Sequence, residues 1–281
     1  MAKIFEIKSG VKKMLKSRGE DSHKGDNGRL LIVGGSEFIH GAPLLAVKGA
    51  YRAGVDLVYL FVPEALVDVA RAAMPDVIVQ GFSGEHFSRE AAKEVIEFGR
   101  RADALLIGPG FMDEEEAVNG VLDVLNGLHL PTVLDTSAIF ALKKISKFPL
   151  EQEIIITPHR NEFRNLVDRD MDIQETDTQS MILLRSIAMD LHINIILKGA
   201  SDLVASEEGE IVRNVTGNSG MTVGGTGDVL AGVAAAFLAQ GNSAFVSSQA
   251  AVYVTGLAGD VAKKRYGDGL MASDVAEEVR V

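Results

Sequence analysis

Residues 217–232 read GNSGMTVGGTGDVLAG, a glycine-rich stretch that runs directly into the apolar segment 229–238. Five of the eleven positions 217–227 are glycine. Glycine tolerates positive φ and allows the backbone to approach a ligand closely. The free N–H groups at the start of the following helix, together with the positive end of its dipole, form a site for an anion. The stretch therefore predicts a phosphate-binding turn followed by a helix.

Other interpretations of this stretch are weaker. A flexible turn before a helix, with Gly232 serving close packing, would explain an isolated glycine pair, but five glycines followed by Asp228 favour the phosphate site. The stretch is not a Walker A loop, because no Gly-Lys-Ser/Thr follows. It is not a dinucleotide fingerprint either, because Leu230 occupies the third glycine position. A hydride-transfer enzyme of the Rossmann type is therefore disfavoured.

Asp228 is the candidate catalytic residue of the stretch. A carboxylate beside a phosphate-binding helix terminus can accept a hydroxyl proton while the backbone amides stabilise the transferring phosphoryl group. Asp is also common as a helix N-cap, which would give Asp228 a purely structural role. The local sequence leaves both roles open.

Outward from this stretch, apolar runs of strand length alternate with segments of helical periodicity. The predicted strands are residues 30–33, 57–62, 77–79, 104–107, 132–134, 154–156 and 193–197, with a hairpin at 203–205 and 210–213. The predicted helices include residues 42–53, 64–73, 89–101, 114–125, 228–239 and 244–265. This alternation predicts an α/β fold with a mostly parallel central sheet flanked by helices on both faces. Without a linker or an internal repeat, we expect a single domain over residues 1–281.

The composition excludes several classes of protein. The chain has 28 basic and 39 acidic residues, and it lacks a Lys/Arg stripe with interleaved aromatics, which argues against a nucleic-acid partner. The absence of Cys excludes disulfides, thiolate nucleophiles and Cys-based metal sites. No run has the length of a membrane span or the pattern of a signal peptide, so we predict a cytoplasmic protein without membrane association.

A family resemblance rests on five segments in a fixed order. Residues 224–232 (GGTGDVLAG) resemble the Gly-x-Gly-Asp signature of the ribokinase-like superfamily. The other segments are KGDNG at 24–28 leading to GGS at 34–36, GAPLLA at 41–46, TPHRNE at 157–162 and KGASD at 198–202. Together they resemble the ADP- or ATP-dependent NAD(P)H-hydrate dehydratases. The resemblance implies a ribokinase-like fold, with residues 1–24 as an N-terminal preface too short for the epimerase domain fused to some family members.

The resemblance also implies a reaction. A nucleotide would phosphorylate the hydroxyl group of (S)-NADHX or (S)-NADPHX, and elimination of phosphate would restore NADH or NADPH. Phosphate is a far better leaving group than hydroxide, which explains the use of a nucleotide. Resemblance to short prokaryotic members favours ADP over ATP. It further implies Mg²⁺ as cofactor and a homo-oligomer, commonly a tetramer.

The same resemblance assigns site residues by position. Asp228 would be the base at the substrate hydroxyl, and Glu162 would help to organise magnesium as a second-shell ligand. The hydrated dinucleotide would contact Ala42, Gly110, His159 and Asp228. The nucleotide would contact Lys198, Gly199, Ala200, Ser201, Asp202, Gly225, Thr226 and Gly227.

Two departures from the family pattern leave other functions open. Arg160-Asn161 stands where members usually carry Pro-Gly, so Arg160 would reach a phosphate or narrow the pocket. The segment DTSA at 135–138 lacks the second acidic residue expected there.

Two other functions stay open. One alternative is a ribokinase-like small-molecule kinase acting on a vitamin precursor or sugar hydroxyl. Another is a nucleotide-sensing module without turnover, against which Asp228 argues.

Overall fold

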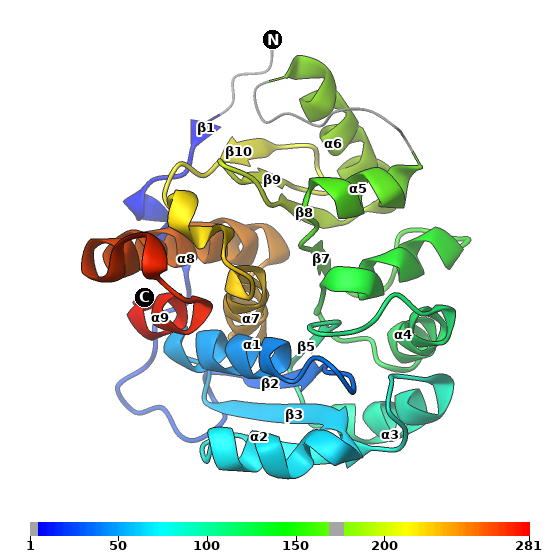
Figure 1. Cartoon of the computed structure of the whole chain (residues 1–281). Helices are drawn as coiled ribbons and strands as arrows, with labels where there is room; N and C mark the ends of the chain where they lie inside the picture. The colour runs from blue at the N-terminus through cyan, green and yellow to red at the C-terminus, as the bar shows by residue number, and fades with distance from the viewer. Residues whose placement is uncertain (1–4, 169–176) are drawn as a thin grey trace.

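A single ten-stranded sheet runs through the computed structural model, which describes residues 5–168 and 177–281 (Figure 1). The strand order is β1-β10-β9-β8-β7-β6-β5-β2-β3-β4. Only the β8–β9 and β9–β10 pairs are antiparallel. The strands are β1 (Phe5–Glu6), β2 (Arg29–Val33), β3 (Leu57–Pro63), β4 (Ile78–Phe82), β5 (Ala104–Ile107), β6 (Thr132–Leu134), β7 (Ile154–Ile156), β8 (Asn194–Leu197), β9 (Leu203–Ala205) and β10 (Ile211–Arg213).

The central strands are apolar apart from Thr132 and Asn194, because helices cover both of their faces. Every residue of β5, β6, β7 and β8 is buried. Their register is in step, with Ile107 opposite Leu134 and Leu134 opposite Ile156. Neighbouring parallel strands therefore end at the same level, and the residues that follow them lie along one edge of the sheet.

The helices form two layers, one on each face of the sheet (Figure 1). One layer holds α1 (Gly41–Arg52), α2 (Val67–Ala73), α7 (Thr226–Ala239), α8 (Ala244–Tyr266) and α9 (Ala272–Glu278). The other holds α3 (Arg89–Gly99), α4 (Glu115–Gly127), α5 (Arg160–Val167) and α6 (Thr178–Leu191). The 3-10 helices are η1 (Ser9–Met14), η2 (Glu64–Leu66), η3 (Thr136–Lys144), η4 (Ser219–Thr222) and η5 (Gly267–Gly269).

The α/β architecture predicted from the sequence is confirmed. Each predicted strand, the hairpin and each named helix is present within a few residues of its predicted bounds. The N-terminal segment adds β1, which pairs with β10 through the 2.8 Å bond from the Ile7 amide to the Arg213 carbonyl. Ile7 and Val11 are buried, so the preface contributes these two side chains to the core. Within the described ranges, no helix combines the length and apolar character that crossing a bilayer requires.

Close packing of α1 against α7 places the start of α7 at the carboxyl edge of the sheet. Gly232 of α7 faces the backbone of Ala46 on α1, and Gly49 of α1 faces the backbone of Val229 on α7. An added Cβ at Gly232 would lie 2.8 Å from the Cα of Ala46, so no larger residue fits without moving a helix. The packing role considered for Gly232 from the sequence is therefore real, and it coexists with the glycine turn that precedes the helix.

Candidate active site

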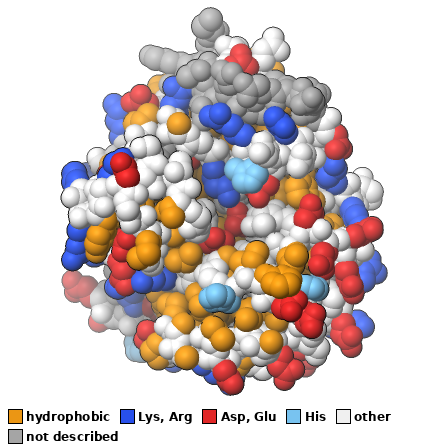
Figure 2. All heavy atoms as spheres, in the orientation of Figure 1, with side chains coloured by type: hydrophobic (Ala, Val, Ile, Leu, Met, Phe, Trp, Pro, Cys, Tyr) orange, Lys and Arg blue, Asp and Glu red, His pale blue; other side chains and the backbone are white. Residues whose placement is uncertain are grey.

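The carboxyl ends of four adjacent parallel strands meet at the candidate site. Gly108, Asp135, Thr157 and Lys198 follow β5, β6, β7 and β8 directly. Ligands of open parallel sheets bind at this edge. Figure 2 shows acidic, basic and histidine side chains meeting near the middle of the face in view.

The start of α7 has the geometry of an anion site. Gly225 is the N-cap and adopts φ 100°, a left-handed conformation that favours glycine. The Thr226 hydroxyl donates to the carbonyl of Met221 at 2.8 Å and fixes the preceding turn. The first N–H groups of a helix have no partner within the helix, so they are available to phosphate oxygens. Asp228 lies in the first helical turn, and the N-cap role considered for it from the sequence is wrong.

Lys198 brings a positive charge to this helix terminus. A Cβ added at Gly227 would lie 3.2 Å from the Lys198 ammonium, which shows how close the two segments are. The ammonium donates to Asp135 Oδ1 at 3.2 Å, and its side chain is only 21% exposed, so it is not a solvated strand end. Burial acts to lower the pKa of Lys198, but the carboxylates of Asp135, Glu162 and Asp228 outweigh it and the pKa is raised. Lys198 therefore stays charged at neutral pH.

The Asp228 carboxyl is far more basic than an ordinary aspartate. Burial first, and the negative charge of Asp135 second, raise its pKa from 3.8 to about 7, although the Lys198 ammonium acts in the opposite direction. A group of this pKa is well suited to accept a proton near neutral pH. Asp228 therefore combines the position and the basicity that a hydroxyl-directed base requires.

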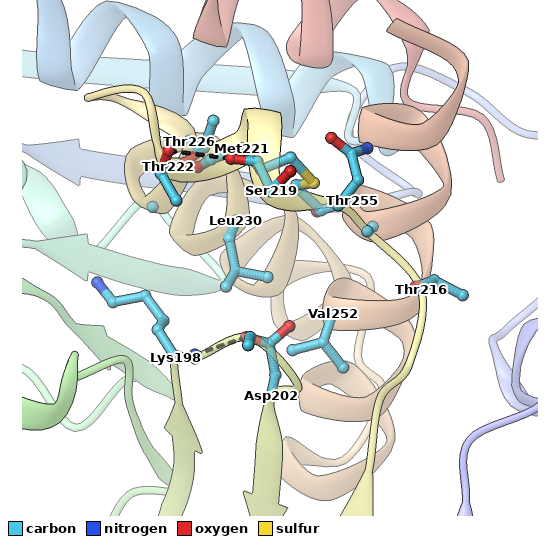
Figure 3. A pocket seen from close by; sticks show the side chains of 16 residues that line it. Lys198, Asp202, Thr216, Ser219, Met221, Thr222, Thr226, Leu230, Val252 and Thr255 are labelled. Carbon is cyan, nitrogen blue, oxygen red and sulfur yellow. Dashed lines mark hydrogen bonds between the residues drawn. The ribbon is translucent and has the colours of Figure 1, made fainter. Parts of the chain in front are cut away.

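A cavity of about 380 Å³ opens beside the glycine turn (Figure 3). Lys198 and Asp202 rise from the strand side, while Leu230 and Val252 face them from α7 and α8. Asp202 accepts from the Gly199 amide at 3.2 Å, which shapes the strand end around the cavity. Of the predicted nucleotide residues, the cavity lining contains Lys198, Gly199, Ala200, Asp202, Thr226 and Gly227, whereas Ser201 and Gly225 lie next to it in the chain.

The other wall of this cavity combines part of the predicted glycine turn with residues of α8 that the sequence did not indicate. It includes Thr216, Asn218 and Met221 from the loop before α7, and Val252, Thr255 and Gly256 from α8. The α8 residues are three and four positions apart and so share one helix face. This spacing could have indicated the shared face from the sequence alone. However, α8 carries small and apolar residues on several of its faces, so the pattern does not stand out.

Besides Asp228, three residues predicted to contact the dinucleotide lie in two places near the strand ends. Gly110 adopts φ 79°, and a Cβ there would lie 3.3 Å from the Cβ of Ala42. The structure thus brings Ala42 and Gly110 together. His159 is the N-cap of α5, and its backbone forms a parallel bridge with Lys198. None of these three residues lines the cavity beside the glycine turn.

His159 and Glu162 cap α5 reciprocally. The His159 side chain accepts from the Glu162 amide at 3.1 Å, and the Glu162 carboxylate accepts from the His159 amide at 2.8 Å. Arg160 and Asn161 occupy the first two helical positions, so their departure from Pro-Gly leaves this capping intact. In the segment 135–138, which lacks the expected second acidic residue, the Ser137 hydroxyl donates to the Met112 carbonyl at 3.0 Å.

Comparison with known proteins gives a consistent result. A family sequence model described as NAD(P)H-hydrate dehydratase matches residues 30–280. The ADP-dependent (S)-NAD(P)H-hydrate dehydratase of Cenarchaeum symbiosum is 36% identical over 269 residues, covering 95% of this chain and 92% of that protein. The bifunctional NAD(P)H-hydrate repair enzyme Nnr of Methanothermobacter thermautotrophicus is 37% identical over 267 residues, covering 94% of this chain. The chain spans about half the length, 51%, of that bifunctional relative.

Solved structures share the fold. The ADP/ATP-dependent NAD(P)H-hydrate dehydratase of Bacillus subtilis, co-crystallised with ATP and Mg²⁺, has a TM-score of 0.85 at 25% identity and covers 99% of this chain and 97% of its own. A ribokinase-like superfamily protein from Enterococcus faecalis has a TM-score of 0.83 at 25% identity, covering 98% and 94%. The ribokinase-like fold predicted from the sequence is therefore confirmed.

Proposed function

Because the chain belongs to the NAD(P)H-hydrate dehydratase family, we propose that it converts (S)-NADHX and (S)-NADPHX to NADH and NADPH in an ADP-dependent reaction. One structural observation carries the proposal. Asp228, with a pKa of about 7, lies in the first turn of helix α7, near the Lys198 ammonium. This places a base for a hydroxyl group next to donors for a phosphoryl group.

In the proposed reaction, the hydroxyl oxygen of the hydrate attacks the terminal phosphorus of the nucleotide. Its proton passes to Asp228, and the P–O bond to the departing nucleotide breaks. Lys198 and the N–H groups of α7 stabilise the charge on the transferring phosphoryl group. Phosphate then leaves with the electrons of the C–O bond, and loss of a ring proton restores the double bond. Asp228 acts only on the hydroxyl proton.

The cavity beside the glycine turn is the proposed nucleotide site. Leu230 and Val252 offer apolar surface for a base, while Lys198 and Gly227 lie at the end nearest the α7 terminus. Ser201 and Gly225, which lie next to the cavity in the chain, would contact the nucleotide through their backbones. Ala42, Gly110 and His159 would hold the hydrated dinucleotide, the first two because their small side chains let it approach the backbone.

Mg²⁺ is the proposed cofactor. Among the side chains that the structure describes, no three His, Cys, Asp or Glu groups cluster as metal ligands. This fits Mg²⁺, which keeps several waters and takes one or two carboxylates together with substrate phosphates. Glu162, with a side chain only 14% exposed, would hold the ion through water. Bound there, Mg²⁺ would neutralise charge on the nucleotide phosphates.

We also propose one domain over residues 1–281, with residues 1–24 as its preface, and a cytoplasmic homotetramer. The single sheet shared by the described residues supports the one domain, since even β1 of the preface pairs within it. The tetramer rests on family resemblance, and the location restates the prediction made from the sequence. Sedimentation of the purified protein would measure the oligomer directly.

The activity is tested by mixing purified protein with NADHX, ADP and Mg²⁺ and following the absorbance of restored NADH. We expect recovery with ADP, and a smaller rate with ATP. Protein carrying Asp228→Asn is the matched control. No recovery with either nucleotide would contradict the proposal, whereas a stable phosphorylated product without elimination would identify a small-molecule kinase instead.

The pH dependence of kcat/KM should follow the protonation of the Asp228 carboxylate. Only the carboxylate form accepts a proton, and a pKa of about 7 leaves Asp228 mostly protonated below that pH. We expect kcat/KM to fall about tenfold per pH unit on the acid side of pH 7 and to level off above it. The measurement is kcat/KM for NADPHX from about pH 5.5 to about pH 9. A rate that stays constant down to pH 5.5 would show that another group is the base.

A further inference from the structure

Asp135 is a buried carboxylate that takes no direct part in the proposed reaction. It is 2% exposed, it follows β6, and neither the glycine turn nor the nucleotide cavity includes it. An ionised carboxylate in such a position is costly unless it is paired and hydrogen-bonded. Its partners therefore indicate what it is for.

The partners of Asp135 hold it in one orientation. Its Oδ1 accepts from the Thr157 hydroxyl at 2.5 Å and from the Lys198 ammonium at 3.2 Å. Its Oδ2 accepts from the Thr136 hydroxyl at 3.3 Å. The carboxylate thus joins the ends of β6, β7 and β8, and the ammonium of Lys198 is the only one of these three partners that reaches the α7 terminus.

The backbone around Asp135 is also unusual. Thr136 adopts φ 55°, a left-handed conformation that is strained for a β-branched residue. Gly108 adopts φ 122°, and a Cβ there would lie 2.9 Å from the carbonyl carbon of Asp135. Strained conformations persist where the surrounding structure fixes a functional geometry. The fold therefore maintains a costly backbone at the point that aims the Asp135 carboxylate.

We infer that Asp135 is a positioning residue that holds the Lys198 ammonium for the transferring phosphoryl group and keeps it from pairing with Asp228, an inference that rests on the proposed function. Asp228 and Glu162 are the other carboxylates that act on Lys198. Without Asp135, the ammonium would turn toward them. An ion pair with Asp228 would make the base less basic and would draw the ammonium away from the phosphoryl group.

The test is a double-mutant cycle of Asp135→Asn and Lys198→Met. Asn keeps the volume and still accepts from Thr157, but it does not hold the ammonium by charge. We expect Asp135→Asn to lower kcat about 100-fold with KM for ADP within about threefold, because displacement of a charge that acts in the transition state affects kcat. In the Lys198→Met background, Asp135→Asn should cause no further loss. If the losses in kcat from the two substitutions multiply in the double variant, the inference is overturned. It is also overturned if Asp135→Asn alone leaves kcat unchanged.

Two measurements separate this role from a structural one. Ser137→Ala removes a buried hydrogen bond two residues away, so it should lower the unfolding temperature and leave kcat unchanged. Lys198→Met leaves the buried Asp135 carboxylate without its ion-pair partner and should lower the unfolding temperature by about 10 °C. Asp135→Asn in that background should restore most of this loss.

If the wild-type protein is inactive on NADHX, the proposed function is contradicted. The unfolding cycle would still decide whether Asp135 and Lys198 are coupled. If Asp135→Asn does not restore the unfolding temperature of the Lys198→Met variant, the pairing of Asp135 with Lys198 is contradicted.

Discussion

Replacement of Asp228 by Asn is expected to lower turnover about 1000-fold while leaving ADP affinity within about threefold of wild type. A positioned general base contributes on the order of 10²–10⁴-fold, and Asn cannot accept the proton. The nucleotide contacts proposed here come from backbone N–H groups at the start of α7 and from Lys198, none of which the substitution removes. Steady-state rates with NADPHX and calorimetric titration with ADP would measure the two effects separately.

The same variant is expected to be more stable than wild type at alkaline pH. The folded state raises the pKa of Asp228 from 3.8 to about 7, so it binds this proton more tightly than the unfolded chain does. The stabilisation is complete below about pH 4 and is lost as the pH rises through about 7. Asn carries no charge, so above pH 7 it should raise the free energy of unfolding by up to about 4 kcal/mol.

Together, the loss of turnover and the gain in stability at alkaline pH would identify Asp228 as the catalytic base. An inactive variant that is also less stable at pH 8 would indicate damage to the fold, and a variant that keeps near-normal turnover would remove Asp228 from the mechanism. Urea unfolding of both proteins at about pH 5 and about pH 8 supplies the comparison. The difference between them should be larger at the higher pH.

Gly232→Ala is expected to cost about 3 kcal/mol of stability or more. The added methyl would collide with the backbone of Ala46, approaching its carbonyl carbon to 2.7 Å, and neither α1 nor α7 can move without disturbing the core. The gain of about 1 kcal/mol in helix propensity from replacing glycine does not offset this collision. Denaturant unfolding would measure the loss.

Gly41→Ala is the matched control for that substitution. Gly41 is the first residue of α1, and an added Cβ there meets no other atom within 4 Å. The same chemical change should therefore be neutral or slightly stabilising. Equal losses at both positions would show that the α1–α7 contact is not the cause.

The strands and long helices were predictable because their signal is local. Residues 104–107 and 154–156 are apolar at every position, as strands covered on both faces must be. Among the elements that were not named from the sequence, α6 has 14 residues, whereas β1 and α9 are short. Strand β1 has two exposed residues and is defined by its pairing with β10, more than 200 residues away, and α9 is only seven residues long.

The glycine turn and the start of α7 were predictable for a different reason. Glycine spacing and the helix that follows are both written in residues 217–239, and the structure places Gly225 at positive φ as the N-cap of α7. The role of Asp135 was not visible in this way. It lies 63 residues from Lys198 in the chain, and its acidic neighbour expected from family resemblance is absent.

The sequence by itself determined the layers, the order of strands and helices along the chain, the glycine turn before α7 and the family. Those features depend on periodicity and on residue type within short windows. Only the tertiary structure decided that Asp135, Thr157, Lys198 and Asp228 meet, because parallel strands of matched register end at one edge of the sheet. It also decided the proton affinity of Asp228, since a pKa of about 7 arises from burial and from charges that the fold brings near, and neither can be read from spacing along the chain.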